Sequence, residues 1–165
     1  MDFMDVVRKR RSIRKYKPDL VPERVILDIM EAARLAPSGI NIQPCHFIVV
    51  RDQKTKSQLH VPEWAAEAPV LIVGCSDAEE SPRWYILDMG IAFEHIVLAA
   101  TNFGLATCWI GWSEYDERTK KVLGIPDRMK VVAVTPLGYP AETPEPKTRK
   151  RLSDIVHLDK FISAQ

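Results

Sequence analysis

Several features that mark particular protein classes are missing from this sequence. Its 165 residues include three cysteines, Cys45, Cys75 and Cys108, and no Cys-x-x-Cys pair, so neither a disulfide scaffold nor a zinc site is indicated. Each cysteine has apolar neighbours and is interpreted as a buried free thiol. The four histidines are scattered, and we predict no bound metal.

Long apolar runs are also absent. The longest, "PVLIVGC" and "IVLAA", are far shorter than the ~20 residues that cross a bilayer, and the first residues contain no apolar signal-peptide core. We therefore expect a cytoplasmic protein without membrane contact. The sequence has neither GxGxxG nor GxxxxGK[ST], so a Rossmann dinucleotide site and a P-loop are not indicated.

Positive charge is concentrated in two short clusters, although the chain as a whole is nearly neutral. Lys and Arg number 23 against 22 Asp and Glu, a formal net charge of +1. The clusters are "RKRRSIRKYK" at 8–17 and "KTRKR" at 147–151. A sequence-independent nucleic-acid binder usually carries a basic excess over a broad face. Two compact clusters from opposite ends of the chain favour a single phosphate-sized anion.

The longest apolar stretches predict the main secondary structure. We expect a helix over "PERVILDIMEAARLAP", begun by Pro22 and stopped by Pro37, and a second helix from Trp84 to Phe103 that Gly104 closes. The segments "HFIVV", "PVLIVGCS" and "KVVAVTPLGYP" predict buried strands, and "ATCWIGW" is strand-like.

The remaining segments predict shorter elements and a tail. We expect one short helix capped by Asp52, another capped by Ser113, and a last one within "LSDIVHLDKF". Strands and helices alternate without a strict βαβ repeat, which predicts an α+β fold with a mixed central sheet flanked by helices. The length fits a single domain over 1–165, with residues 140–165 as an extended C-terminal tail.

Four segments are informative when they are taken in order: "RRSIRKY", "APSGINIQPCHFIVV", "ATCWIGW" and "LGYPAE…PKTRKRL". With these segments at this spacing, the sequence resembles the nitroreductase family of flavoproteins in a compact form, over nearly its whole length. The resemblance implies an α+β domain that forms an intertwined homodimer with FMN at the subunit interface. It also implies that the tail packs on the partner subunit.

The resemblance further implies which residues bind FMN. One subunit would contribute Arg10, Arg11, Ser12 and Arg14, and the other would contribute Pro37, Ser38, Gly39 and Asn41. Ile110 and Gly111 would lie near flavin N5, and Lys147 and Arg149 near the phosphate. Arginine forks, a hydroxyl and a lysine suit a phosphate that carries close to two negative charges. A cation at Arg14 would stabilise the negative charge of reduced flavin.

The function implied is an FMN-dependent oxidoreductase. It would pass a hydride from NADH or NADPH through flavin N5 to a small acceptor, nitroaromatic, quinone or flavin-like, in a ping-pong cycle. We assign no catalytic side chain, because this chemistry needs orientation and charge stabilisation more than an acid or base. Two alternatives stay open: an FMN carrier or sensor without NAD(P)H turnover, and a nucleic-acid-binding module.

Structural interpretations also stay open for individual residues. Ser38 and Asn41 are common turn formers, and Gly111 would suit a β-bulge. Asp88 and Glu94 on the long helix are expected in surface or interface salt bridges. Cys45 stands where many family members carry a tryptophan, and the short 51–68 segment leaves open what covers the flavin. The candidates to line that pocket are Trp84, Trp109 and Trp112, for which core packing is an equal alternative.

Overall fold

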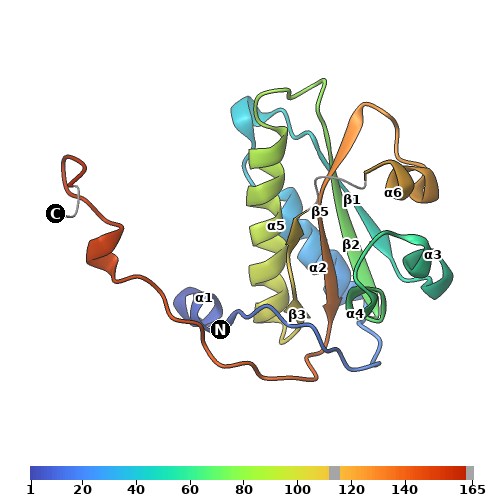
Figure 1. The fold of residues 1–165 in the computed structure, drawn as a ribbon, viewed down its shortest axis with the longest axis horizontal. Coiled ribbons are helices and arrows are strands. Elements are labelled where there is room, and N and C mark those ends of the chain that lie inside the picture. The colour runs from blue at the N-terminus through green and yellow to red at the C-terminus, as the bar shows by residue number, and fades with distance from the viewer. Residues whose placement is uncertain (112–115, 163–165) are drawn as a thin grey trace.

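The computed structural model describes residues 1–111 and 116–162 (Figure 1). Its α-helices are α1 (Phe3–Lys9), α2 (Glu23–Arg34), α3 (Gln53–Gln58), α4 (Glu63–Ala66), α5 (Tyr85–Asn102) and α6 (Asp116–Leu123). Its strands are β1 (Cys45–Val50), β2 (Val70–Asp77), β3 (Ala106–Thr107), β4 (Ile110–Gly111) and β5 (Met129–Gly138). Two 3₁₀ turns are η1 (Gly39–Asn41) and η2 (Leu152–Asp154).

The sheet is antiparallel, where the sequence predicted a mixed one. Its strand order is β1-β2-β5-β3, and β4 pairs with β5 beside β3. Among the described residues, the parallel pairing that the structure contains is a single isolated β-bridge between Ser12 and Thr107. A parallel pair needs a crossover that returns the chain to the opposite end of the strands. The short α3 and α4 instead bring the chain into β2 at the same end of the sheet where β1 finishes, so the two strands run antiparallel. The α+β class is confirmed.

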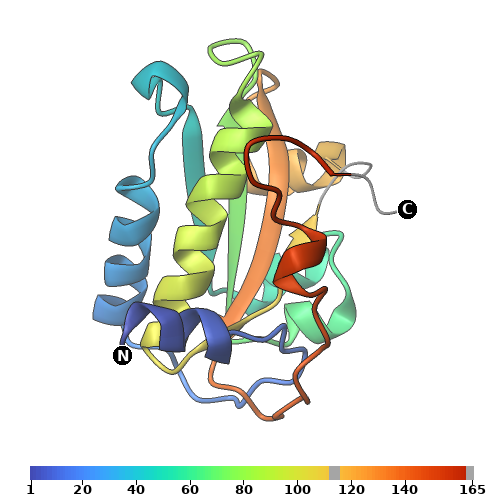
Figure 2. The ribbon, with the colours of Figure 1, turned by 90° about the vertical axis from the view of Figure 1, so that its left-hand side faces the viewer.

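Helices cover both faces of this sheet. α2 and α5 lie on one face, and α3, α4 and α6 lie on the other (Figures 1 and 2). The predicted apolar stripe of α5 is buried at every position: Met89, Ala92, Phe93, Ile96, Val97 and Ala100. The helix ends at Asn102, and Gly104 has the left-handed φ of 73° that the sequence predicted. The two main predicted helices and the three predicted strands are therefore confirmed. The buried character predicted for β1 is wrong, because β1 lies at the edge of the sheet and Val50 is its one fully buried residue.

The 51–69 segment forms a compact support for the sheet. Asp52 caps α3 as predicted, and its carboxylate accepts a hydrogen bond of 2.7 Å from the Thr55 backbone N–H. The sequence did not predict α4, which follows Pro62. The buried ammonium of Lys56 donates to the Ala68 carbonyl at the end of α4. This bond fixes α4 against the sheet.

The N-terminal segment runs along one end of the sheet and meets the C-terminal part of the chain. Ile13 N–H donates to the Thr107 carbonyl (3.0 Å), and Lys17 N–H donates to the Tyr139 carbonyl (2.9 Å). Tyr16 and Pro140 form an antiparallel bridge. Segments far apart in the sequence, around residues 12–17 and 139–142, are therefore held side by side.

The C-terminal end of the chain passes the N-terminal segment and then leaves the body of the molecule (Figure 1). The short helix expected within "LSDIVHLDKF" is reduced to the η2 turn. Its apolar side chains are exposed, including Leu152 at 72% and Phe161 at 78%. A short helix is marginal in water without a surface on which to pack, which explains the difference.

The predictions on Trp112 and Ser113 lie outside the described residues. Within the described ranges, no helix combines the length and apolar character that spanning a membrane requires. No group of three His, Cys, Asp or Glu side chains in the same ranges could hold a metal ion.

Candidate functional site

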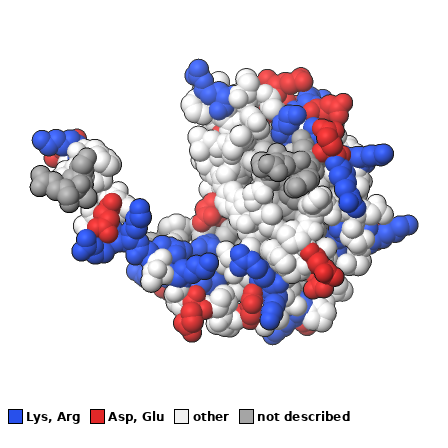
Figure 3. Space-filling view, viewed as in Figure 1, with Lys and Arg blue, Asp and Glu red and all other residues white. Residues whose placement is uncertain are grey.

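The two basic clusters of the sequence meet at one cavity of about 460 Å³. We call it the cationic cavity. Six predicted site residues line it, Arg10, Arg11, Ser12, Arg14, Lys147 and Arg149, together with Val7, Arg8, Pro144, Glu145 and Pro146. Figure 3 shows lysine and arginine side chains gathered where the tail leaves the body. Both ends of the chain therefore contribute cations to one cavity.

The cations of this cavity differ in their partners. Arg11 donates to the carbonyls of Arg8 (2.6 Å) and Arg10 (2.8 Å), so its guanidinium is partly engaged with the backbone. Arg149 donates to the Lys147 carbonyl at 3.2 Å. The side chains of Arg10 and Lys147 make no hydrogen bond or ion pair with any residue in the described ranges. Arg10 and Lys147 are thus the cations most available to a bound anion.

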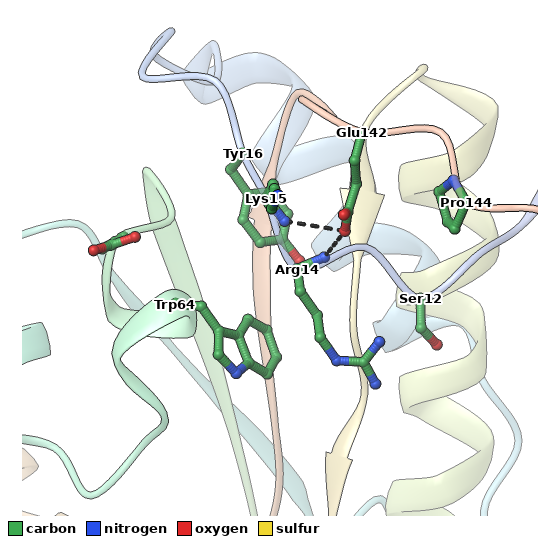
Figure 4. A pocket seen from close by; sticks show the side chains of 8 residues that line it. Ser12, Arg14, Lys15, Tyr16, Trp64, Glu142 and Pro144 are labelled. Carbon is green, nitrogen blue, oxygen red and sulfur yellow. Dashed lines mark hydrogen bonds between the residues drawn. The ribbon is translucent and has the colours of Figure 1, made fainter.

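A second cavity, of about 570 Å³, lies on the other side of Arg14. We call it the Trp64 cavity. It is lined by Ser12, Arg14, Lys15, Tyr16, Trp64, Glu67, Glu142 and Pro144, and Figure 4 shows its walls. Ser12, Arg14 and Pro144 line both cavities. Arg14 consequently stands at the boundary between the cationic cavity and the Trp64 cavity, which has an aromatic wall.

Trp64 is a residue that the sequence reasoning missed. It is half-buried on α4, and the Arg14 guanidinium lies 5.7 Å from the centroid of its ring. Of the tryptophans proposed instead, Trp109 packs on Phe93, with ring centroids 5.4 Å apart, and Trp84 stands against Gly39. The signal that could have identified Trp64 is "PEWAA", where a proline and a glutamate begin a short helix.

Tyr16 is held as a hydrogen-bond donor. Its hydroxyl donates to the Ile13 carbonyl. Burial raises the pKa of the phenol well above its ordinary value, and the neighbouring Cys108 and Glu142 raise it further. Tyr16 therefore stays neutral and supports the backbone of the 12–16 segment.

The predicted loop residues lie elsewhere. Pro37 and Ser38 line a third cavity of about 190 Å³ with Cys45 and Asp88, and neither they nor Gly39 and Asn41 line the cationic cavity. Burial raises the pKa of the Cys45 thiol to about 11, so this cysteine is not a ready thiolate. That this loop serves the flavin of a second subunit stays a prediction.

Asp88 differs from the sequence-based expectation. The salt bridge expected for it is absent from the described part of the chain, because its carboxylate is buried and accepts the Gly39 backbone N–H at 2.9 Å. Its other oxygen, Oδ2, has no hydrogen-bond partner among the described residues. Asp88 therefore supports the loop around Gly39 through this hydrogen bond.

Ile110 and Gly111 form β4 and pair regularly with Val134 and Ala133 of β5. Gly111 is therefore not a bulge. A Cβ added to it would meet nothing within 4 Å, so packing within this chain does not require a glycine there. Neither residue lines the two cavities around Arg14.

Comparison with known proteins places this geometry in a family. The family model described as "Nitroreductase family" matches residues 7–65 and 56–139. A relative from Methanothermobacter thermautotrophicus, named "Putative NADH dehydrogenase/NAD(P)H nitroreductase", is 37% identical over 98% of this chain and 88% of its own. An NADH dehydrogenase of Thermus thermophilus is 29% identical over 94% of this chain and 95% of its own.

Solved structures agree with these matches. The FMN-dependent nitroreductase of Clostridium difficile R20291 superposes with a TM-score of 0.85 at 31% identity, covering 96% of this chain and 99% of its own. The cationic cavity, the antiparallel sheet between two helical layers and the matches along the sequence lead to one assignment: the chain belongs to the nitroreductase family.

Proposed function

We propose that this chain is an FMN-dependent oxidoreductase that uses NADH or NADPH to reduce a small acceptor in a ping-pong cycle. The cationic cavity is the observation that carries this proposal, because six residues predicted for FMN from both ends of the sequence converge there. Family membership, and the names of the relatives as NAD(P)H nitroreductases and an FMN-dependent nitroreductase, support it.

The donor set fits a phosphate monoester. Six cations line the cavity against one carboxylate, that of Glu145, and the Ser12 hydroxyl adds a neutral donor. A phosphate near two negative charges is bound best by several fixed, charge-assisted donors. The cations face one cavity of limited volume, which suits a mononucleotide better than a polymer backbone.

Arg14 has a different place from the phosphate-binding cations. It lines both cavities, so its charge is available beyond the phosphate (Figure 4). When bound, FMN accepts a hydride at N5 and returns the electrons to an acceptor. Arg14 would offset the negative charge that reduction places on the pyrimidine end, and the Ser12 and Lys147 donors would keep the cofactor oriented.

The acceptor would be small and planar, such as a nitroaromatic, a quinone or a flavin-like ring. The Trp64 cavity supports this size class, because it offers about 570 Å³ beside Arg14 and an aromatic wall. Entry and exit of nicotinamide and acceptor at one place would give the ping-pong order.

We further propose that the protein is a homodimer in which the tail, 140–165, packs on the partner subunit. Exposed apolar side chains support this arrangement: Leu27 and Leu35 on or after α2, Ile86 and Leu87 on α5, and Leu152, Ile155, Leu158, Phe161 and Ile162 in the tail. Apolar surface on this scale usually marks an interface. The loop from Pro37 to Asn41 would then complete the flavin site of the other subunit.

The test is an absorption spectrum after FMN has been added and the excess removed. A retained flavin spectrum that bleaches with NADH or NADPH under anaerobic conditions supports the oxidoreductase. Retained flavin that dithionite bleaches and NAD(P)H does not would instead identify a carrier or sensor. No retained flavin, with strongly salt-dependent binding of DNA or RNA, would overturn the proposal. Sedimentation of the same sample tests the dimer.

A further inference from the structure

Arg14 is held from two directions, by its backbone and by its side chain. The flanking backbone is anchored at both ends, because Ile13 N–H donates to the Thr107 carbonyl and Ala141 N–H donates to the Lys15 carbonyl (2.9 Å). Between these anchors, the N–H groups of Arg14 and Lys15 have no backbone acceptor among the described residues. A side chain supplies the acceptor for both N–H groups instead.

The acceptor is the carboxylate of Glu142. One oxygen, Oε1, accepts the Arg14 N–H at 2.6 Å and the Lys15 N–H at 3.2 Å. Bonds from backbone amides to a carboxylate are charge-assisted and stronger than bonds between neutral groups. Glu142 therefore fixes the direction in which the Arg14 side chain leaves the backbone. Figure 4 shows the guanidinium directed away from Glu142 and into the cavity.

Trp64 restrains the other end of the Arg14 side chain. The guanidinium lies 5.7 Å from the centroid of the indole ring, within the range of a cation–π contact. The indole is itself held in place, because the neighbouring Ala65 is fully buried and Lys56 fixes the end of α4. Without Trp64, the guanidinium would move among the rotamers open to an exposed side chain.

We propose that Glu142 and Trp64 are positioning residues that hold the Arg14 cation where it stabilises reduced FMN over oxidised FMN. This inference rests on the proposed function. It assigns to the 51–69 segment, through Trp64, a part in setting the reduction potential of the flavin. A cation fixed in advance stabilises developing charge better than a mobile one, because no reorganisation is needed when the charge appears.

The test compares the flavin midpoint potential of wild type with those of Glu142→Ala, Glu142→Gln and Trp64→Leu, measured by equilibration with a redox dye. Trp64→Leu compared with wild type, and Glu142→Ala compared with Glu142→Gln, should favour oxidised over reduced flavin by about 3- to 10-fold, which is up to about 30 mV downward for two electrons. Glu142→Gln keeps an oxygen acceptor for both amides but loses the negative charge, so its potential should lie slightly above wild type, like that of Glu67→Ala.

Glu67→Ala is the matched control. Glu67 is an exposed carboxylate that lines the same cavity and has no bond to the backbone at Arg14. Removing a negative charge near the flavin raises the potential by simple electrostatics, whereas releasing Arg14 lowers it. Glu142→Ala does both, whereas Glu142→Gln loses the charge alone, so the difference between these two variants measures the positioning effect. A Glu142→Ala potential equal to that of Glu142→Gln overturns the positioning role.

Trp64→Leu keeps the proposal testable if Glu142→Ala does not fold, because it leaves the backbone bonds intact. Its potential should fall, and Trp64→Phe, which keeps an aromatic face, should recover most of the loss. An unchanged potential in Trp64→Leu overturns the role of the indole. If wild-type protein retains no FMN at all, the proposed function itself fails, which is distinct from a wild-type potential in the variants.

Discussion

The buried carboxylate of Asp88 accepts a hydrogen bond of 2.9 Å from the backbone N–H of Gly39, and this bond joins α5 to the loop that follows α2. The loop needs such a support. Ile40, Asn41 and Gln43 have φ values of 43°, 61° and 58°, in the left-handed region that costs a non-glycine residue on the order of 1 kcal/mol or more. Strained backbone persists where surrounding contacts hold it, and such strain is common at binding sites.

Replacing Asp88 should release this loop. Asp88→Ala leaves the Gly39 N–H without its acceptor, so we expect a loss of about 1–3 kcal/mol in the free energy of unfolding together with weaker retention of FMN. Asp88→Asn keeps an acceptor oxygen and should lose less of both. Urea unfolding and FMN fluorescence titration measure the two quantities. Equal, wild-type values for both variants would show that the loop does not depend on this bond.

The two glycines assigned to the cofactor should respond differently to alanine. A Cβ at Gly111 meets nothing within 4 Å, so Gly111→Ala should leave the thermal midpoint of the free protein within a few degrees of wild type. If the Gly111 backbone approaches the flavin closely, the same variant should bind FMN at least about tenfold more weakly. A wild-type dissociation constant would remove Gly111 from the site.

Gly39 provides the contrast within the same experiment. A Cβ there would lie 2.7 Å from Cδ1 and 2.8 Å from Cγ of Trp84, atoms near the base of the indole side chain. Gly39→Ala should therefore lower stability by about 1–3 kcal/mol before any effect on the cofactor is considered. The Trp84→Ala background should recover part of this loss, which a double-mutant cycle would detect.

Arg149→Ala should act mainly on cofactor retention. Loss of one charge-assisted contact to the phosphate is worth about 1.5–3 kcal/mol, which predicts FMN binding weaker by about 10- to 150-fold. The reduction rate of the flavin that remains bound should change little. Arg151→Ala is the control on the same tail, because Arg151 pairs with Asp154 at 3.0 Å and does not line the cavity. Similar FMN affinities for the two variants would contradict the role assigned to Arg149.

Stability at acidic pH should depend on Asp77 at the end of β2. Its carboxylate accepts the N–H of Glu80 (3.0 Å) and the guanidinium of Arg128 (2.7 Å), which together hold the pKa of Asp77 below its ordinary value. A carboxyl with a lowered folded pKa adds stability that is present above its unfolded pKa, about 3.9, and is lost as the pH falls through the folded value.

Asp77→Asn should therefore melt below wild type at pH 7, and the gap should narrow as the pH falls below about 4. Thermal midpoints of both proteins between pH 7 and pH 3 measure this. A gap that stays constant over that range would mean that Asp77 contributes through shape rather than charge.

The sequence allowed prediction of the elements whose signal is local. The stripe of α5, the cap at Asp52 and the left-handed Gly104 each depend on neighbours within one or two turns, and each was confirmed. The convergence of residues 10–14 with 147–149 was anticipated from charge alone, because two dense clusters on a neutral chain need a shared anion.

The parts that could not be predicted depend on contacts between distant segments. Trp64 belongs to the candidate site because its ring lies beside the Arg14 side chain, which comes some fifty residues earlier in the sequence. Nothing in the local sequence marks Asp88 as buried, and its burial depends on distant segments such as the Gly39 loop that pack on α5. The antiparallel order of the sheet likewise follows from where α3 and α4 return the chain, which no local pattern encodes.

The cationic cavity takes one wall from residues 8–14 and the other from residues 144–149, and this has a consequence for the order of events in the cell. A growing chain folds its N-terminal parts first. The sheet core can form while the second wall is still being synthesised, so the cationic cavity is incomplete in the nascent protein. If FMN binds as proposed, it would therefore be incorporated only after synthesis of this wall, and a chain that stops before residue 144 should fold without retaining flavin.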